Sequence, residues 1–206
     1  MKWLKYFILV LFHPIDTFYL IKKDRKQISK VALLTILALA VAVKILYVYT
    51  VNFTVSLTTA ADANAIIEIG IILVPILLWA VANYALMTVC GGESTIMETL
   101  AISVYSLAPY IVLTPITILV SHVLSRTEYA FYIGIQAFII AWMVVLLFIG
   151  FMQSNGLKFS QALWLAFVSI LVMVLIVVVV LLAFGLGAQI VRFIQELVAE
   201  FKFLIR

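Results

Sequence analysis

Five long apolar segments dominate this chain and limit what it can fold into. Each carries at most one charged side chain, and each reaches the length of about 20 residues that an α-helix needs to cross a bilayer. None shows the strict apolar–polar alternation of a half-buried strand. The sequence therefore predicts an all-α membrane bundle with five transmembrane helices, at about residues 31–51, 65–89, 99–121, 131–152 and 162–188.

The composition supports this prediction. Of the 206 residues, 67% are hydrophobic and 11% are charged, whereas soluble domains carry about 25% charged residues. So few charges cannot cover a water-facing surface, and the apolar side chains must face lipid instead. The connections are short, and no change in composition marks a boundary. We therefore expect residues 1–206 to form a single membrane domain.

Both ends of the chain predict helices that lie on the membrane surface. Residues 3–12 are apolar and follow a lysine, but ten residues are too few to span the core. Residues 189–206 place apolar and polar side chains on opposite helical faces, which is typical of an amphipathic helix. We interpret both ends as interfacial, with docking of a partner as an alternative for the second.

The distribution of charge predicts the orientation. Cytoplasmic segments carry more lysine and arginine than external ones. Of 13 such residues, those in the first thirty positions are Lys2, Lys5, Lys22, Lys23, Arg25, Lys26 and Lys30. The N-terminus is therefore expected inside, and five spans place the C-terminus outside. The basic N-terminus is expected to contact anionic lipid headgroups rather than nucleic acid, because no recognition module accompanies it.

Hydroxyl side chains follow one face of the third segment. At 100° per residue they fall within about 80° of arc, which predicts that this helix lies at the bundle centre. They are Thr99, Ser103, Ser106, Tyr110, Thr114, Thr117 and Ser121. Two interpretations remain open: the hydroxyls bond their own helix or a neighbouring one, or they line a polar pathway together with Asn83 and Gln136. Pro109 and Pro115 in this segment, and Pro75 in the second, predict kinks or breaks.

Lys44 is the basic residue inside a predicted span, and such charges need an explanation. It lies about 10 Å below the outer end of its helix, at 1.5 Å per residue. Glu68 lies near the same end of the next span. Snorkelling of Lys44 to the surface is the favoured interpretation, and an intramembrane ion pair of Lys44 with Glu68 is the alternative.

The sequence gives little sign of enzymatic chemistry. His13 and His122 fall at opposite ends of the predicted bundle, and neither has a second ligand at metal-binding spacing. Cys90 is the one cysteine, which excludes an internal disulfide. No motif for a nucleophile, a metal or a phosphate is present. We therefore predict no catalytic, cofactor-binding or metal-binding residues, and no cofactor.

Several segments, taken in order, resemble the Yip1 domain family of five-span membrane proteins in its bacterial form. The resemblance rests on His13-Pro14, Phe18 and the basic run at 21–30, on Gly91-Gly92-Glu93-Ser94-Thr95 with Glu98, on the Tyr-x-Leu-x-Pro pattern at 105–109, and on the closing stretch at 193–206. It implies an inside N-terminus, five spans, no catalytic residues and, for a bacterial protein, the cytoplasmic membrane. Eukaryotic members are associated with Rab GTPases, but their Asp-Leu-Tyr-Gly-Pro motif is absent here, which argues against Rab binding.

Three functions remain open. The leading hypothesis is a non-enzymatic protein that organises other membrane components or serves as their accessory, with a membrane protein such as a transporter as partner. Its expected contact turn is Gly91, Gly92 and Glu93. The alternative is a transporter, channel or permease subunit that uses the third-span hydroxyls as a pathway. A lower alternative is a lipid-handling protein with a groove near Tyr105 or Tyr110.

Overall fold

The computed structural model describes residues 2–24, 28–52, 64–92 and 94–204. Within them it contains five helices long and apolar enough to cross a membrane. The helices are α1 (Lys2–Phe12), α2 (Pro14–Lys23), α3 (Lys30–Thr50), α4 (Ala65–Val89), α5 (Ile96–Tyr105), α6 (Ala108–Ser121), α7 (Tyr129–Asn155) and α8 (Phe159–Leu204), with a 3-10 turn η2 (Arg126–Glu128) before α7. The predicted all-α bundle is confirmed.

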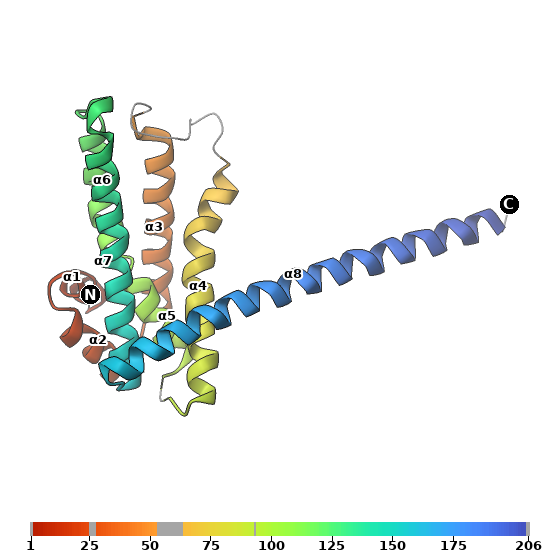
Figure 1. The fold of residues 1–206 in the computed structure, drawn as a ribbon, viewed down its shortest axis with the longest axis horizontal. Coiled ribbons are helices and arrows are strands. Elements are labelled where there is room, and N and C mark those ends of the chain that lie inside the picture. The colour runs from red at the N-terminus through yellow and green to blue at the C-terminus, as the bar shows by residue number, and fades with distance from the viewer. Residues whose placement is uncertain (1, 25–27, 53–63, 93, 205–206) are drawn as a thin grey trace.

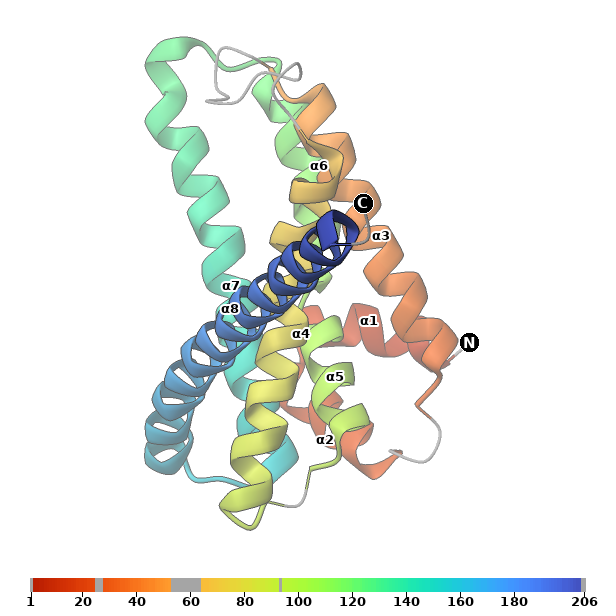
Figure 2. The ribbon, with the colours of Figure 1, turned by 90° about the vertical axis from the view of Figure 1, so that its right-hand side faces the viewer.

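The first four spans, α3, α4, α5 with α6, and α7, run alternately between two ends of the bundle (Figure 1). We call the end where α4 and α7 finish the turn end, because both helices end there in glycine turns, at Gly91 and Gly156. The opposite end, where α3 and α6 finish, is the loop end. Helices α1 and α2 pack against the half of the bundle nearer the turn end (Figure 2).

Local sequence signals set the helix boundaries. Ser29 and Asn64 cap α3 and α4 by accepting bonds from the Ala32 and Ile66 amides, at 3.3 and 2.9 Å. Thr95 and Glu98 form a reciprocal capping box at the start of α5. Such caps satisfy amides that have no partner within the helix.

The third span is broken in the middle. Helix α5 ends at Tyr105 and α6 begins at Ala108, so the predicted helix at 99–121 is two helices. Pro109 explains the break, since it has no amide to donate to Tyr105 and its ring crowds that carbonyl. The predicted effect is confirmed at Pro109. By contrast, Pro75 and Pro115 lie inside helices that continue past them.

The third span is also the centre of the bundle, as its hydroxyl stripe predicts. It is 67% buried, against 33% or less for each of the other four spans. Every residue from Ala101 to Pro109 is buried, so the family-like Tyr-x-Leu-x-Pro pattern occupies the middle of the core. Around it pack Val10 of α1, Phe18 of α2 and Leu146 of α7.

The two ends of the chain differ from the expected surface helices. Helix α1 is present, but it packs against the bundle and buries Phe7 and Val10 in the core. The predicted C-terminal helix is not separate, because α8 continues through residues 189–204 without a break. Two glycines near the junction, Gly185 and Gly187, cost a helix only about 1 kcal/mol each, and no proline follows.

Helix α8 packs on the bundle only at its beginning. Its 46 residues extend about 70 Å at 1.5 Å per residue, roughly twice the hydrocarbon core of a bilayer. It contacts α4 and α7 near the turn end and then leaves the bundle at a steep angle to the other spans (Figure 1). All residues from Val177 to Leu197 are exposed and largely apolar.

Candidate functional site

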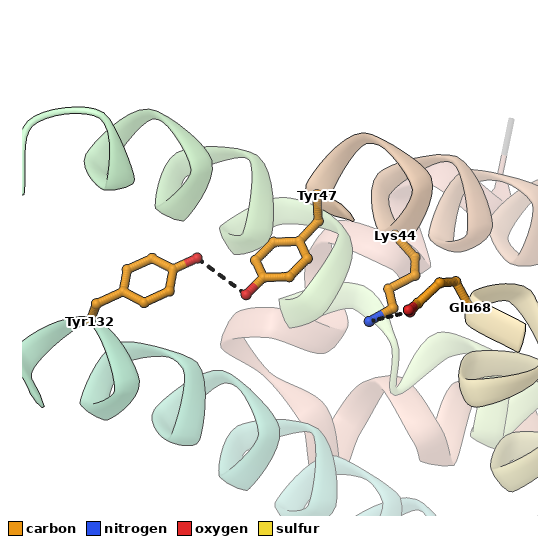
Figure 3. Close-up of polar contacts among 4 residues, drawn as sticks. All are labelled: Lys44, Tyr47, Glu68 and Tyr132. Atoms are coloured by element: carbon orange, nitrogen blue, oxygen red, sulfur yellow. Dashed lines mark hydrogen bonds and ion pairs between the residues drawn. The ribbon is translucent and has the colours of Figure 1, made fainter. Parts of the chain in front are cut away.

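An ion pair joins two spans near the loop end. Lys44 lies in the last two turns of α3, and Glu68 lies in the first turn of α4. The Lys44 Nζ and Glu68 Oε2 atoms are 3.1 Å apart, and the side chains keep only 18% and 16% of their exposure (Figure 3). The ammonium also lies 5.5 Å from the centre of the Tyr47 ring. Lys44 thus pairs with Glu68 in this structure.

Beside the ion pair, a chain of hydrogen bonds connects α3 with two further helices, α6 and α7. Tyr132 of α7 donates to the Tyr47 hydroxyl of α3 at 3.3 Å (Figure 3). Gln136 of α7 donates to Tyr132 and to Thr117 of α6, each at 3.1 Å. We call the ion pair and this chain together the polar cluster. It comprises Lys44, Tyr47, Glu68, Thr117, Tyr132 and Gln136.

The polar cluster ties four helices together inside apolar surroundings. Thr117 and Tyr132 are 97% and 98% buried, and water has little access to their bonds. Polar groups in such a place must find partners inside the protein, because lipid offers none. The cluster can therefore hold α3, α4, α6 and α7 in one arrangement, and its charged pair could also respond to a ligand or proton.

The hydroxyl stripe of the third span bonds mainly within its own helices, and Thr117 and Ser121 also accept bonds from Gln136 and from the Asn52 amide. Six of its seven side chains are buried, and Tyr110 is partly buried. Five hydroxyls donate to a carbonyl three or four residues earlier, at 2.6–3.1 Å: those of Thr99, Ser103, Ser106, Thr117 and Ser121. Tyr110 and Thr114 are not among these five, and the Thr114 Oγ1 is buried with no hydrogen-bond partner among the described residues.

The two residues expected to flank a pathway have different neighbours. Gln136 reaches the stripe through Thr117. Asn83 does not, because its amide donates to the Trp79 carbonyl and its carbonyl accepts from Ser169 of α8, both at 2.8 Å. Asn83 therefore connects α4 with α8 rather than with the stripe.

The expected contact turn adopts a glycine C-cap. Gly91 has a left-handed φ of 75°, and the Gly92 amide donates to the Met87 carbonyl at 2.7 Å. This is a Schellman motif, in which the left-handed residue after the helix is usually glycine. The same geometry ends α7 at Gly156, where the Leu157 amide donates to Met152. Glu93, the charged member of the predicted turn, lies outside the described residues.

Sequence reasoning missed Tyr47, Tyr132 and Ser169. Tyrosine near the end of a span is typical of the interface, and a single serine in a span is usually a packing residue. Tyr132 lies four residues before Gln136, and Tyr47 lies three residues after Lys44. These spacings were the available signals, but a pairing across helices cannot be inferred from one segment. Among the described residues, no three His, Cys, Asp or Glu side chains gather to hold a metal ion.

These features define a class: a polytopic helical membrane protein with a broken, buried third span. The comparisons with known proteins give its family. The Yip1 domain matches residues 8–182, most of the chain, so this protein belongs to the Yip1 domain family. The matched region includes all five spans up to the middle of α8. Searches of curated proteins and of solved structures found no match.

Proposed function

We propose that this chain is a non-enzymatic membrane protein that organises other membrane components or serves as an accessory to them. The observation that carries the proposal is a contrast between two regions: the third span is buried and bonds mainly within itself, whereas most of α8 has no neighbouring helix. Most stripe hydroxyls donate to backbone carbonyls of their own helices, which favours packing over a water-filled pathway. Meanwhile α8 extends a long apolar surface away from the bundle.

A partner of matching chemistry is another membrane protein, such as a transporter. Lipid covers an apolar helix as well as a partner does, so only a specific contact distinguishes the two. The turn Gly91–Gly92 with Glu93 is the proposed second contact, at the other side of the membrane from the end of α8. In this proposal the N-terminus and the turn end face inward, where α1 and α2 carry basic side chains suited to anionic headgroups.

Site-specific photo-cross-linking in native membranes tests this proposal. A photoreactive residue replaces Leu182, which is 62% exposed on α8, and a matched probe replaces Phe131, which is 64% exposed on α7. A thiol-linked probe on Cys90 reports on the turn. We expect one discrete protein adduct from Leu182 and Cys90 and none from Phe131. Lipid adducts alone at all three positions contradict the proposal.

A second candidate, a subunit of a transporter or channel, is favoured by the Lys44–Glu68 pair, because intramembrane charges often serve ions or substrates. It predicts ion or solute flux in proteoliposomes that falls when Lys44→Met removes the ammonium. Flux equal to that of empty vesicles removes this candidate.

A further inference from the structure

Helix α8 crosses α4 near the turn end and is bonded to it there. The Ser169 hydroxyl of α8 donates to Asn83 Oδ1 of α4 at 2.8 Å, and both side chains are buried. After Ser169 no described side chain of α8 is buried, and all from Val177 to Leu197 are exposed. The crossing is therefore the last place where α8 is held, and the longer part of the helix is free to turn about it.

The other spans fix how the bundle stands in a bilayer. Helix α4 has 25 residues, so it is about 38 Å long and crosses a hydrocarbon core of about 30 Å only when its tilt stays below about 40°. Helices α3, α4 and α7 run in roughly the same direction, and α8 leaves them at a steep angle (Figure 1 and Figure 2). In this extended arrangement α8 lies much closer to the plane of the bilayer than the other spans do.

The extended arrangement keeps the charged end of α8 at the depth of the membrane core. In both views the end of α8 lies at a level between the two ends of the bundle (Figure 1 and Figure 2). Arg192 and Glu196 on this part of α8 are exposed, so no other helix covers them. Charged side chains that face lipid at such a depth are costly. A bilayer therefore favours an arrangement that moves residues 189–204 out of the core.

Turning α8 about the crossing until it lies along α4 has this effect. The two helices are then antiparallel, because α4 ends at the turn end and α8 begins there. Ala65, the first residue of α4, lies 18 residues before Asn83, and Gly187 lies 18 residues after Ser169. Gly187 thus comes level with Ala65. Gln189, the next polar residue, passes the loop end of α4 together with the charged residues that follow it.

The length of the apolar part of α8 fits this second arrangement. From Leu165 to Ala188 the helix has no polar side chain except Ser169, the residue that bonds to α4. This part is about 36 Å long at 1.5 Å per residue, enough to cross a core of about 30 Å at the tilt of the other spans. At a steeper angle it would not reach both surfaces of the bilayer.

The first turns of α8 have space to move. A pocket of about 280 Å³ has Gln161, Trp164 and Leu165 of α8 in its lining, together with Cys90 and Gly91 after α4. When the longer part of α8 turns toward the loop end, its first turns move the opposite way, toward the turn end, where this pocket lies. The pocket leaves room for the motion on this side of the crossing.

We propose that α8 is a hinged span, which in a bilayer turns about the Asn83–Ser169 contact and docks along α4. In the docked arrangement Gly187 is level with Ala65, and residues 189–204 lie beyond the loop end. The chain's own α8 covers this side of α4, because the crossing already places the two helices in contact. The proposal concerns contacts within one chain and does not depend on the partner-organising function.

The distance between two spin labels tests the docking. In a full-length chain with Cys90→Ser, the labels are attached at Ile66→Cys on α4 and Ile194→Cys on α8, where the native side chains are 80% and 53% exposed. Docked helices have axes about 8–10 Å apart, and Ile194 lies about 12 Å farther along than Ile66. In vesicles with a core of about 30 Å, we therefore expect a distribution centred below about 25 Å. A distribution centred beyond that value, as any crossing angle above about 60° would give, overturns the proposal.

A second copy of the chain is the other source of a short distance. Mixing the labelled protein with a tenfold excess of unlabelled protein before reconstitution leaves a distance within one chain unchanged. It removes most of a distance between two chains. A short distance that survives the dilution supports docking of α8 on its own α4, and its loss overturns the proposal.

The thickness of the bilayer tests what sets the angle of α8. In short-chain lipids with a core of about 20 Å, an apolar helix of about 36 Å fits at a tilt of up to about 55°. We expect the distance between the labels at Ile66 and Ile194 to increase there by about 10 Å. The matched control pair is Ile66→Cys with Phe131→Cys on α7, which is 64% exposed, and its distance should stay the same because both helices belong to the bundle. An Ile66–Ile194 distance that does not depend on thickness contradicts the proposal.

Discussion

The two ends of the bundle are held together by different kinds of contact. Near the turn end, α1, α2, α5 and α7 meet through close apolar packing, and polar groups are closed locally by helix caps. Near the loop end, side-chain bonds connect the helices: the Lys44–Glu68 pair and the Tyr47–Tyr132–Gln136–Thr117 chain. Where packing is close, an added atom lowers stability because there is no space for it. Where polar pairs hold the helices, stability falls when one partner of a pair is removed. Substitutions should therefore fail in different ways at the two ends.

The largest effect is expected where packing is closest. A Cβ on Gly150 of α7 would lie 2.3 Å from the Ile102 Cγ2 methyl and 3.3 Å from the Phe18 ring. That methyl belongs to a β-branched side chain in a helix, which has little freedom to rotate away. We expect Gly150→Ala to lower the free energy of unfolding in detergent by about 3 kcal/mol, the upper range for overpacking.

The same helix provides the control. A Cβ on Gly134 of α7 would meet no atom within 4 Å. Gly134→Ala should leave stability unchanged or raise it slightly, because alanine favours a helix over glycine. An equal loss of stability in both variants would show that close contact at Gly150 is not the cause.

The next effect concerns the ion pair. Lys44→Met leaves the Glu68 carboxylate without its ammonium in partly buried surroundings, and we expect a loss of about 2 kcal/mol, below the 3–5 kcal/mol of a fully buried pair. Replacing both partners, as Lys44→Met with Glu68→Leu, should restore most of the stability, because no lone charge remains. Thermal unfolding of the two single variants and the double variant gives the coupling energy. Additive losses contradict a direct interaction.

How far the sequence predicted this molecule depends on whether a feature is local. The spans follow from hydropathy, with boundaries within a few residues except at α8. The break near Pro109 follows from the missing amide, and the burial of the third span follows from its hydroxyl face. Each of these inferences needs only the residues of one segment.

The remaining features required knowledge of neighbouring segments. Nothing in α7 alone shows that Gly150 faces Ile102 while Gly134 faces open space. Snorkelling of Lys44 was the favoured interpretation and pairing with Glu68 the alternative, and the structure has the pair. The choice depended on where Glu68 lies, which one helix alone does not show. The continuation of α8 through the expected boundary at residue 188 reflects helix propensity without a strong stop signal.

A smaller effect should follow from the hydrogen-bond chain at the loop end. Gln136→Leu removes the bonds to Tyr132 and Thr117, but both keep another partner, Tyr47 and the Thr114 carbonyl respectively. We expect a loss of about 1 kcal/mol, within the range measured for polar contacts between membrane helices. Gln153→Leu near the end of α7 is the control and should have little effect in the same unfolding assay. A loss as small for Gln136→Leu would show that the chain does not stabilise the bundle.

The smallest effect, at the start of the chain, carries a pH signature. The Tyr6 hydroxyl of α1 donates to Asp24 Oδ2, just after α2, at 2.8 Å. This bond, with partial burial and the negative charge of Asp24, raises the pKa of the Tyr6 phenol above its usual value of 10. Because the folded-state pKa is raised, the stabilisation is present below pH 10 and is lost as the pH rises through the folded-state pKa. We expect Tyr6→Phe to lose about 0.5 kcal/mol at pH 7, since the pair is only partly buried and water screens its charge. In thermal unfolding, that difference from the unmodified protein should shrink above pH 10 and disappear above the raised folded-state pKa. A difference that stays constant with pH would mean that the hydroxyl acts through packing rather than through its bond to Asp24.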